Sequence, residues 1–204
     1  GDQEISFSTS APFYALTRSD YYFLGYGRRI NDKLTLGLTY NMLAIGPTFF
    51  TTTINGVPFD AQTPSTTNLT ATAVYSPLEG LQVGANINML TLKYFDNADK
   101  KPAMHIDLGA LYKYELSEKQ ALQFGLSMNN PLGSSVTIVS PIGGEASNFL
   151  PIVGRFAVAY MLNSKMNIPG GGEGDFAFTA TIGYQDVLNS DFRNTFRIGT
   201  EAVL

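Results

Sequence analysis

Few residues in this chain have side chains suited to catalysis, and its single histidine is the clearest candidate. His105 lies two residues before Asp107, and in a β-strand this spacing places both side chains on one face. Such a pair can hydrogen-bond or supply two ligands to a metal. Two ligands are too few for a metal site, and the chain has no Gly-x-Ser-x-Gly, Walker or dinucleotide-binding motif. We therefore predict no enzyme activity, no catalytic residue, no cofactor and no metal.

In other predicted strands, arginine and carboxylate side chains lie on the same face of the sheet as His105 and Asp107. Arginine can hold a carboxylate ligand through two parallel hydrogen bonds. Alternatively, buried arginines and carboxylates pair with one another and brace an interior. Both interpretations apply to the same candidate polar residues of an interior face: Arg29, His105, Asp107, Arg155, Arg193, Arg197 and Glu201.

Most of the chain alternates between apolar and small polar residues with a period of two, which predicts β-strands. In 81–95, for example, Val83 and Ile87 share one face, while Gly84 and Asn88 share the other. Several of the predicted strands exceed ten residues, and a tilted strand that crosses a bilayer needs about nine to eleven. The predicted strands are 3–9, 20–30, 33–44, 67–76, 81–95, 103–115, 119–130, 151–162, 175–186 and 192–203.

The composition excludes several classes of protein. Charged residues make up 15% of the chain, whereas about 25% is usual in soluble domains. No apolar run approaches the roughly 18 residues of a transmembrane helix, and the chain contains no cysteine. The net charge of −4 and the lack of a basic stripe argue against a nucleic-acid partner. Glycine, threonine, serine and asparagine must therefore provide most of the polar surface.

The connections between the predicted strands alternate in length. Short turns at 31–33, 77–80 and 116–119 are separated by longer segments, chiefly 45–66 and 131–150. Short turns at one end and long loops at the other are typical of outer-membrane barrels. We therefore predict an all-β fold, an antiparallel transmembrane β-barrel of the outer-membrane type, formed by the whole chain as one domain. A soluble β-sandwich or lipocalin-like barrel with the same apolar face buried is the alternative.

Glycine and tyrosine positions favour the membrane barrel. Glycines such as Gly84, Gly125 and Gly183 recur on the polar face, although glycine weakens a strand unless another group approaches closely. The crowded interior of a barrel supplies such a reason. Four tyrosines lie on the apolar face near short turns, where an aromatic girdle would meet lipid headgroups: Tyr26, Tyr75, Tyr114 and Tyr160.

The two long segments are unusually apolar for solvent-exposed loops. Such segments can form a hydrophobic vestibule for a ligand, dock a partner protein, or fold over the barrel and pack on each other. The candidate binding residues in these loops are Phe49, Phe50, Ile54, Phe59, Ile138, Phe149 and Leu150.

Several stretches resemble a known family. Residues 21–43 (YYFLGYGRRINDKLTLGLTYNML) resemble a hairpin of the outer-membrane long-chain fatty-acid transporters. Residues 105–138 and 149–162 resemble a repeated block of the related type IX secretion outer-membrane proteins. That block reads D-x-G-x-x-Y, a turn, L-x-F-G-L-x-x-x-N, L-G-S, and then L-P-x-x-x-R-x-A-x-A-Y. Residues 192–204 resemble its late strand. Barrels of this family usually have fourteen strands and an N-terminal hatch, so we expect a smaller relative or part of a larger barrel.

The resemblance implies a non-enzymatic protein of the bacterial outer membrane. The type IX branch implies an accessory or partner subunit of a secretion or uptake machine. The fatty-acid branch implies a passive transporter of hydrophobic small molecules, and a soluble lipid-binding β-barrel is a third alternative. The expected partners are outer-membrane lipid, a larger membrane or secreted protein, and, for a transporter, a fatty or other hydrophobic ligand.

Overall fold

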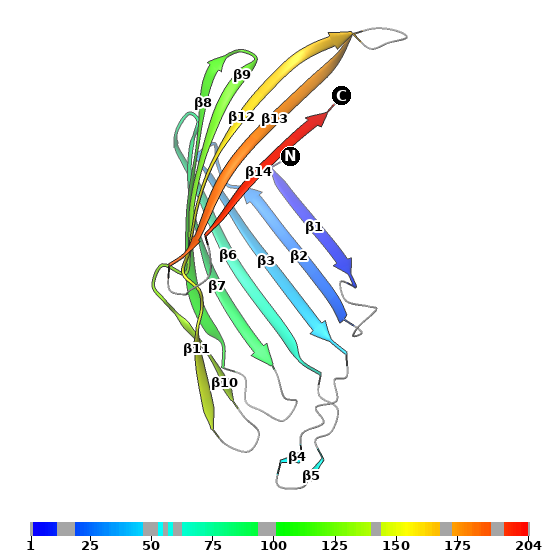
Figure 1. Ribbon diagram of the computed structural model, residues 1–204, viewed down its shortest axis with the longest axis vertical. Coiled ribbons are helices and arrows are strands. Elements are labelled where there is room, and N and C mark those ends of the chain that lie inside the picture. The colour runs from blue at the N-terminus through cyan, green and yellow to red at the C-terminus, as the bar shows by residue number, and fades with distance from the viewer. Residues whose placement is uncertain are drawn as a thin grey trace. The chain divides into compact units, whose positions relative to one another are not determined.

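Antiparallel β-strands form nearly all of the structure, a computed structural model that describes residues 2–11, 19–46, 53–54, 57–58, 63–93, 101–139, 144–167, 173–188 and 194–203. Ten strands form one large sheet, in which each strand lies beside its neighbour in the chain (Figure 1). Among the described residues, no helix is long and apolar enough to cross a membrane. The ten strands are β1 (Gln3–Ser10), β2 (Ser19–Arg29), β3 (Leu34–Ile45), β6 (Ser65–Leu78), β7 (Leu81–Lys93), β8 (Ala103–Ser117), β9 (Gln120–Asn129), β12 (Val153–Asn167), β13 (Glu173–Val187) and β14 (Thr195–Val203).

The prediction of an all-β antiparallel fold is confirmed, because each of the ten predicted stretches forms one strand of this sheet. The main error in length concerns 151–162, which continues as β12 to Asn167. The two long connections, which we predicted as loops, include further strands. They contain two small hairpins, β4 (Thr53–Ile54) with β5 (Val57–Pro58) and β10 (Ser135–Val139) with β11 (Glu145–Phe149).

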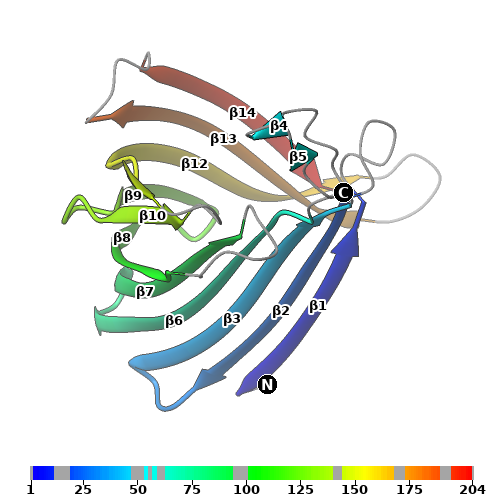
Figure 2. The same ribbon diagram turned by 90° about the horizontal axis from the view of Figure 1, so that it is seen from below.

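The strand order of the large sheet has two ends. β1 pairs with β2 and β14 pairs with β13, and no ladder joins β1 to β14 within the part of the chain that the structure describes (Figures 1 and 2). The antiparallel sheet is thus established, whereas closure into a barrel is not part of the observed pairing.

The chain divides into two compact units, of which the first comprises Gly1–Ala73, Asn86–Ile106 and Leu132–Leu150. Its strands expose their large apolar side chains on one face: Leu24 and Leu38 are each about half exposed, and they belong to the same side of the β2–β3 ladder. The opposite side carries Thr70 and Asn88, which are 7% and 4% exposed and share a hydrogen bond of 2.7 Å. Burial in this unit is therefore greater on the polar side than on the apolar side.

The second unit comprises Val74–Ala85, Asp107–Pro131 and Pro151–Leu204, and it has the same two-sided character. Leu126 on β9 lies opposite Phe156 on β12, and their side chains are 61% and 48% exposed. The neighbouring residues on the other side are small, since Gly125 lies opposite Ala157. We call the side of Leu126 the apolar face and the side of Gly125 the glycine face.

The turn between β6 and β7 depends on glycine. Gly80 has φ of +76°, and a Cβ atom there would lie 2.4 Å from the carbonyl oxygen of Lys113. The same segment is tied to β8, because the Lys113 N–H donates to the Gly80 carbonyl at 2.8 Å. Only glycine fits this conformation and this close backbone approach without strain.

Candidate functional site

Arg155 is the most firmly positioned of the predicted interior arginines. Its Nε donates to Gln185 Oε1 on β13 at 3.0 Å, and its Nη1 donates to the side-chain oxygen of Asn129 on β9. Among the described residues, the guanidinium forms no ion pair with a carboxylate. The side-chain amides of Gln185 and Asn129 thus orient Arg155. Because these amides are neutral, they do not compensate its positive charge. A cation held in this way can receive a carboxylate from a ligand.

Asp107 approaches the same strands from β8, where its Cα lies opposite Asn129. Its Oδ1 accepts the backbone N–H of Asn130 at 3.0 Å. Asn130 is 2% exposed and has φ of +49°, a left-handed conformation that asparagine adopts more readily than most residues. The carboxylate of Asp107 therefore stabilises the backbone where β9 ends, which is a structural role.

Arg197 on β14 shares a depression of about 330 Å³ with Arg155. Its Cα lies opposite Gly183 on β13, and a Cβ added at the nearby Gly199 would meet nothing within 4 Å. Arg155 lies opposite Gln185 and Arg197 opposite Gly183, so the two arginine backbones are two strands apart and offset by two residues, about 12 Å in all. Gly183 and Gly199 have no side chain to fill the space between the two arginines. Together these residues could bind an anionic group.

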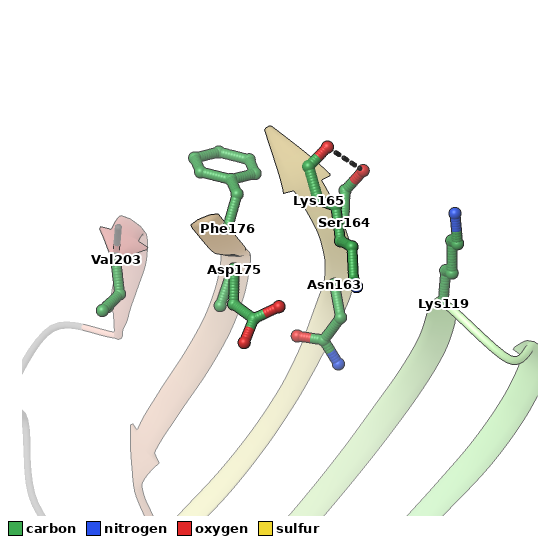
Figure 3. Close-up of a pocket in the computed structure, with 8 residues that line it drawn as sticks. Lys119, Asn163, Ser164, Lys165, Asp175, Phe176 and Val203 are labelled. Atoms are coloured by element: carbon green, nitrogen blue, oxygen red, sulfur yellow. Dashed lines mark hydrogen bonds between the residues drawn. The ribbon is translucent and has the colours of Figure 1, made fainter. Parts of the chain in front are cut away.

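A second depression, of about 520 Å³, lies where β12, β13 and β14 approach the turn between β8 and β9. Lys165 lies opposite Asp175 in the β12–β13 ladder, and the Asn163 N–H donates to the Lys119 carbonyl at 2.8 Å. Figure 3 shows the carboxylate of Asp175 and the ring of Phe176 on opposite sides of β13. The lining thus combines two lysines, a carboxylate, an amide and an aromatic ring. This group was not predicted from the sequence, although charged residues of both signs occur near the ends of these strands.

The hairpin β10–β11 contains three of the residues predicted to bind a ligand or partner. Phe149 is 78% exposed, whereas Ile138 and Leu150 are half-buried. The Leu150 N–H donates to the Ser134 carbonyl at 2.9 Å, which continues the ladder beyond β11. Of the three, Phe149 is the residue most accessible to a partner.

The remaining predicted interior residues do not join one cluster. Arg29 forms an exposed ion pair with Asp32 in the adjoining turn, at 3.6 Å between Nη2 and Oδ1. Glu201 is exposed on β14, opposite Thr179. His105 is half-buried on β8 and belongs to the first unit, whereas Asp107 belongs to the second.

Some predicted residues lie outside the part that the structure describes. They are Phe49, Phe50, Phe59 and Arg193, and for Ile54 in β4 only the backbone is described. Within the described ranges, no group of three or more histidine, aspartate or glutamate side chains could hold a metal ion.

The hydrogen-bond partners of Arg155 were not predicted from the sequence. Gln185 and Asn129 occupy the expected face of their strands, so the period of two could have placed them there. Their alignment with Arg155 depends on the register across the β12–β13 and β9–β12 ladders. Neither register follows from alternation alone.

Comparison with known proteins gives no family assignment. No protein-family model matches the chain, and no curated protein sequence matches it significantly.

Proposed function

We propose that this chain is a non-enzymatic β-barrel protein of the bacterial outer membrane, which acts as an accessory subunit of a secretion or uptake machine. The observation that carries the proposal is the distribution of burial over the two faces of the sheet. In each unit, large apolar side chains are exposed on one face, while the buried strand residues lie on the other. Water penalises such an arrangement, whereas lipid favours it.

The buried residues of the large sheet support this interpretation individually. Ala121 and Val153 in the second unit lie on the glycine face, as their registers with Glu115 and Asn129 show. In the first unit, Thr70 and Asn88 are buried together through their hydrogen bond. A soluble lipocalin-like barrel would bury its apolar face instead. It would not leave Leu126, Ile182 and Ile198 more than half exposed.

Strand number and length also support a barrel. The sheet has ten strands, an even number, so antiparallel pairing of β1 with β14 would close it without breaking the alternation. Within this sheet, every strand except β1 and β14 has 10 to 15 residues, long enough to cross a bilayer at a tilt. In lipid, unpaired strand edges are costly, which favours closure.

The accessory role rests on the exposed hairpin β10–β11 and on the resemblance to type IX secretion outer-membrane proteins. Phe149 is 78% exposed at the end of β11, where a partner could bury it. Burial of an exposed aromatic side chain is a frequent source of binding energy between proteins.

Passive transport of a fatty ligand is the second candidate function, and Arg155 favours it. Its guanidinium is oriented by two amides, beside Arg197 in the same depression. Such a pair could hold the carboxylate of a fatty acid.

One extraction experiment separates the candidates. The protein is extracted from its native membrane with a mild detergent, and mass spectrometry identifies what co-purifies. A stoichiometric larger protein supports the accessory role, and bound fatty acid without such a protein supports transport. Recovery in the soluble fraction without detergent contradicts the membrane location.

A further inference from the structure

We infer that Arg28 and Gln3 bind the phosphate group of a glycerophospholipid. The inference rests on the proposed membrane location and names the lipid chemistry that one part of the sheet recognises. Gln3 lies opposite Arg28, where β1 begins and β2 ends. Opposed residues of an antiparallel ladder project to the same side of the sheet, so both side chains can reach one ligand.

Arg28 is an exposed cation on a largely apolar side of three strands. Leu24 and Tyr26 precede it on the same side of β2 at spacings of two residues. Among the described residues of β1, β2 and β3, Arg28 is the one arginine or lysine on this side. Its guanidinium forms no hydrogen bond or ion pair with a described residue. Arginine presents parallel N–H groups that match two oxygens of a phosphate, so such an anion suits this position.

The side chain of Gln3 is oriented by Tyr26. The Tyr26 hydroxyl donates to Gln3 Oε1 at 3.4 Å, and Tyr26 lies two residues from Arg28 on the same side of β2. With its oxygen engaged, Gln3 has its NH2 group left to donate beside Arg28. We call Gln3, Tyr26 and Arg28 the headgroup cluster. Because a guanidinium and an amide NH2 supply only donors, the cluster suits an anion such as phosphate and not a cation.

An apolar surface adjoins the headgroup cluster along β1, β2 and β3, which lie side by side (Figure 2). From Arg28 to Leu24, β2 rises about 14 Å, close to the roughly 15 Å depth of one hydrocarbon leaflet. Free phosphate would leave this surface in water, whereas the acyl chains of a lipid would cover it. The apolar side chains on this side, each more than 40% exposed, are Ile5, Phe7, Leu24, Leu36 and Leu38.

The turn after β2 indicates the leaflet. β2 ends at Arg29 and β3 begins at Leu34, so the connection is short. In an outer-membrane barrel, the short turns face the periplasm. Arginine near a membrane surface lays its aliphatic stem on apolar groups and extends its charged end to the headgroups. The headgroup cluster would therefore lie at the level of the lipid phosphates of the periplasmic leaflet.

The test compares Arg28→Gln with Arg29→Gln, because these neighbours project to opposite sides of β2. Both arginines are exposed, and each substitution removes one positive charge; Arg29 loses only its exposed ion pair with Asp32. The full chain is purified in a nonionic detergent, and native mass spectrometry measures the binding of dioleoylphosphatidylglycerol. We expect Arg28→Gln to weaken binding about tenfold. Arg29→Gln is expected to bind the lipid as the unmodified protein does.

Two further probes separate the lipid from its parts. Dioleoylglycerol has the same acyl chains without phosphate, and we expect it to bind weakly and equally to the unmodified protein and both variants. Glycerol 3-phosphate has the phosphate without acyl chains, and we expect it not to displace the bound lipid even in large excess.

Four results would overturn the inference. They are no lipid binding to the unmodified protein, equal binding by the two variants, equal binding of dioleoylglycerol and dioleoylphosphatidylglycerol, and displacement of the lipid by glycerol 3-phosphate. The need for detergent is measured in parallel. If the protein stays in solution without detergent and Arg28→Gln alone loses the lipid, the membrane location fails while the phosphate site stands. If the protein needs detergent and both variants bind equally, the site fails while the membrane location stands.

Discussion

Ile182 on β13 lies directly opposite Ile198 on β14, and the two side chains are 53% and 82% exposed. Next to them on β13, Thr181 lies opposite Gly199 on the other side of the sheet. In water, such an isoleucine pair would be a site for aggregation. In a bilayer it would contact lipid, and the small residues behind it would face the interior.

Substitutions at Val83 and Gln82, neighbours in one strand, test which face of the sheet contacts lipid. Both lie in β7, and Val83 is 39% exposed on the apolar face. If this face meets lipid, Val83→Arg should lower the free energy of unfolding in lipid vesicles by about 2–4 kcal/mol. Gln82→Arg should cost much less, because its side chain projects to the opposite side. Urea titration of both variants measures the difference, and equal or reversed costs would contradict the assignment.

Barrel closure can be tested with cysteines, since the chain has none of its own. We expect Ser6→Cys on β1 to form a disulfide with a cysteine at one of the inward β14 positions, Arg197, Gly199 or Glu201. A disulfide requires Cα atoms about 4.4–6.8 Å apart, so only the correct register should cross-link. Ile198→Cys, which projects to the other face, is the control. Failure of all the inward pairs would argue against pairing of β1 with β14.

Substitution of Arg155 and of Arg197 distinguishes a structural role of these side chains from a role in ligand binding. Arg155→Leu removes two solvent-exposed hydrogen bonds, to Gln185 and Asn129, and should reduce stability by about 0.5–1.5 kcal/mol. Arg197 makes no side-chain hydrogen bond to another described residue, so Arg197→Leu should change stability little. If the pair holds a carboxylate, both substitutions should weaken fatty-acid binding, as measured by calorimetry. If fatty-acid binding is unchanged in both variants, this pair has no role in transport.

Gly80 should tolerate no side chain. Gly80→Ala places a Cβ 2.4 Å from the Lys113 carbonyl in a backbone conformation with φ of +76°. We expect a loss of about 2 kcal/mol or more from strain and from the displaced backbone. Gly199→Ala is the matched control, because its Cβ would meet nothing within 4 Å. Thermal unfolding of the two variants compares them, and similar midpoints would show that the turn is not constrained as described.

Features that depend on residues close together in the sequence were predicted, whereas features that depend on pairing between distant strands were not. The ten long strands were predictable because alternation over ten residues is a local property, as Val83, Ile87 and their polar neighbours show. The hairpin β10–β11 was not predicted, since Val136 and Ile138 provide only one short alternation between turn residues. The partners of Arg155 were not predicted because register is set by pairing between strands.

Whether the apolar face of the sheet contacts lipid can be measured with tryptophan, which the chain lacks. Ile182→Trp and Thr181→Trp each introduce a single tryptophan, at one of two adjacent positions of β13. In vesicles that contain brominated lipids, we expect strong quenching and a blue-shifted emission for Ile182→Trp and little quenching for Thr181→Trp. Quenching of Thr181→Trp alone, or of neither variant in the reconstituted protein, would contradict the claim that the apolar face meets lipid.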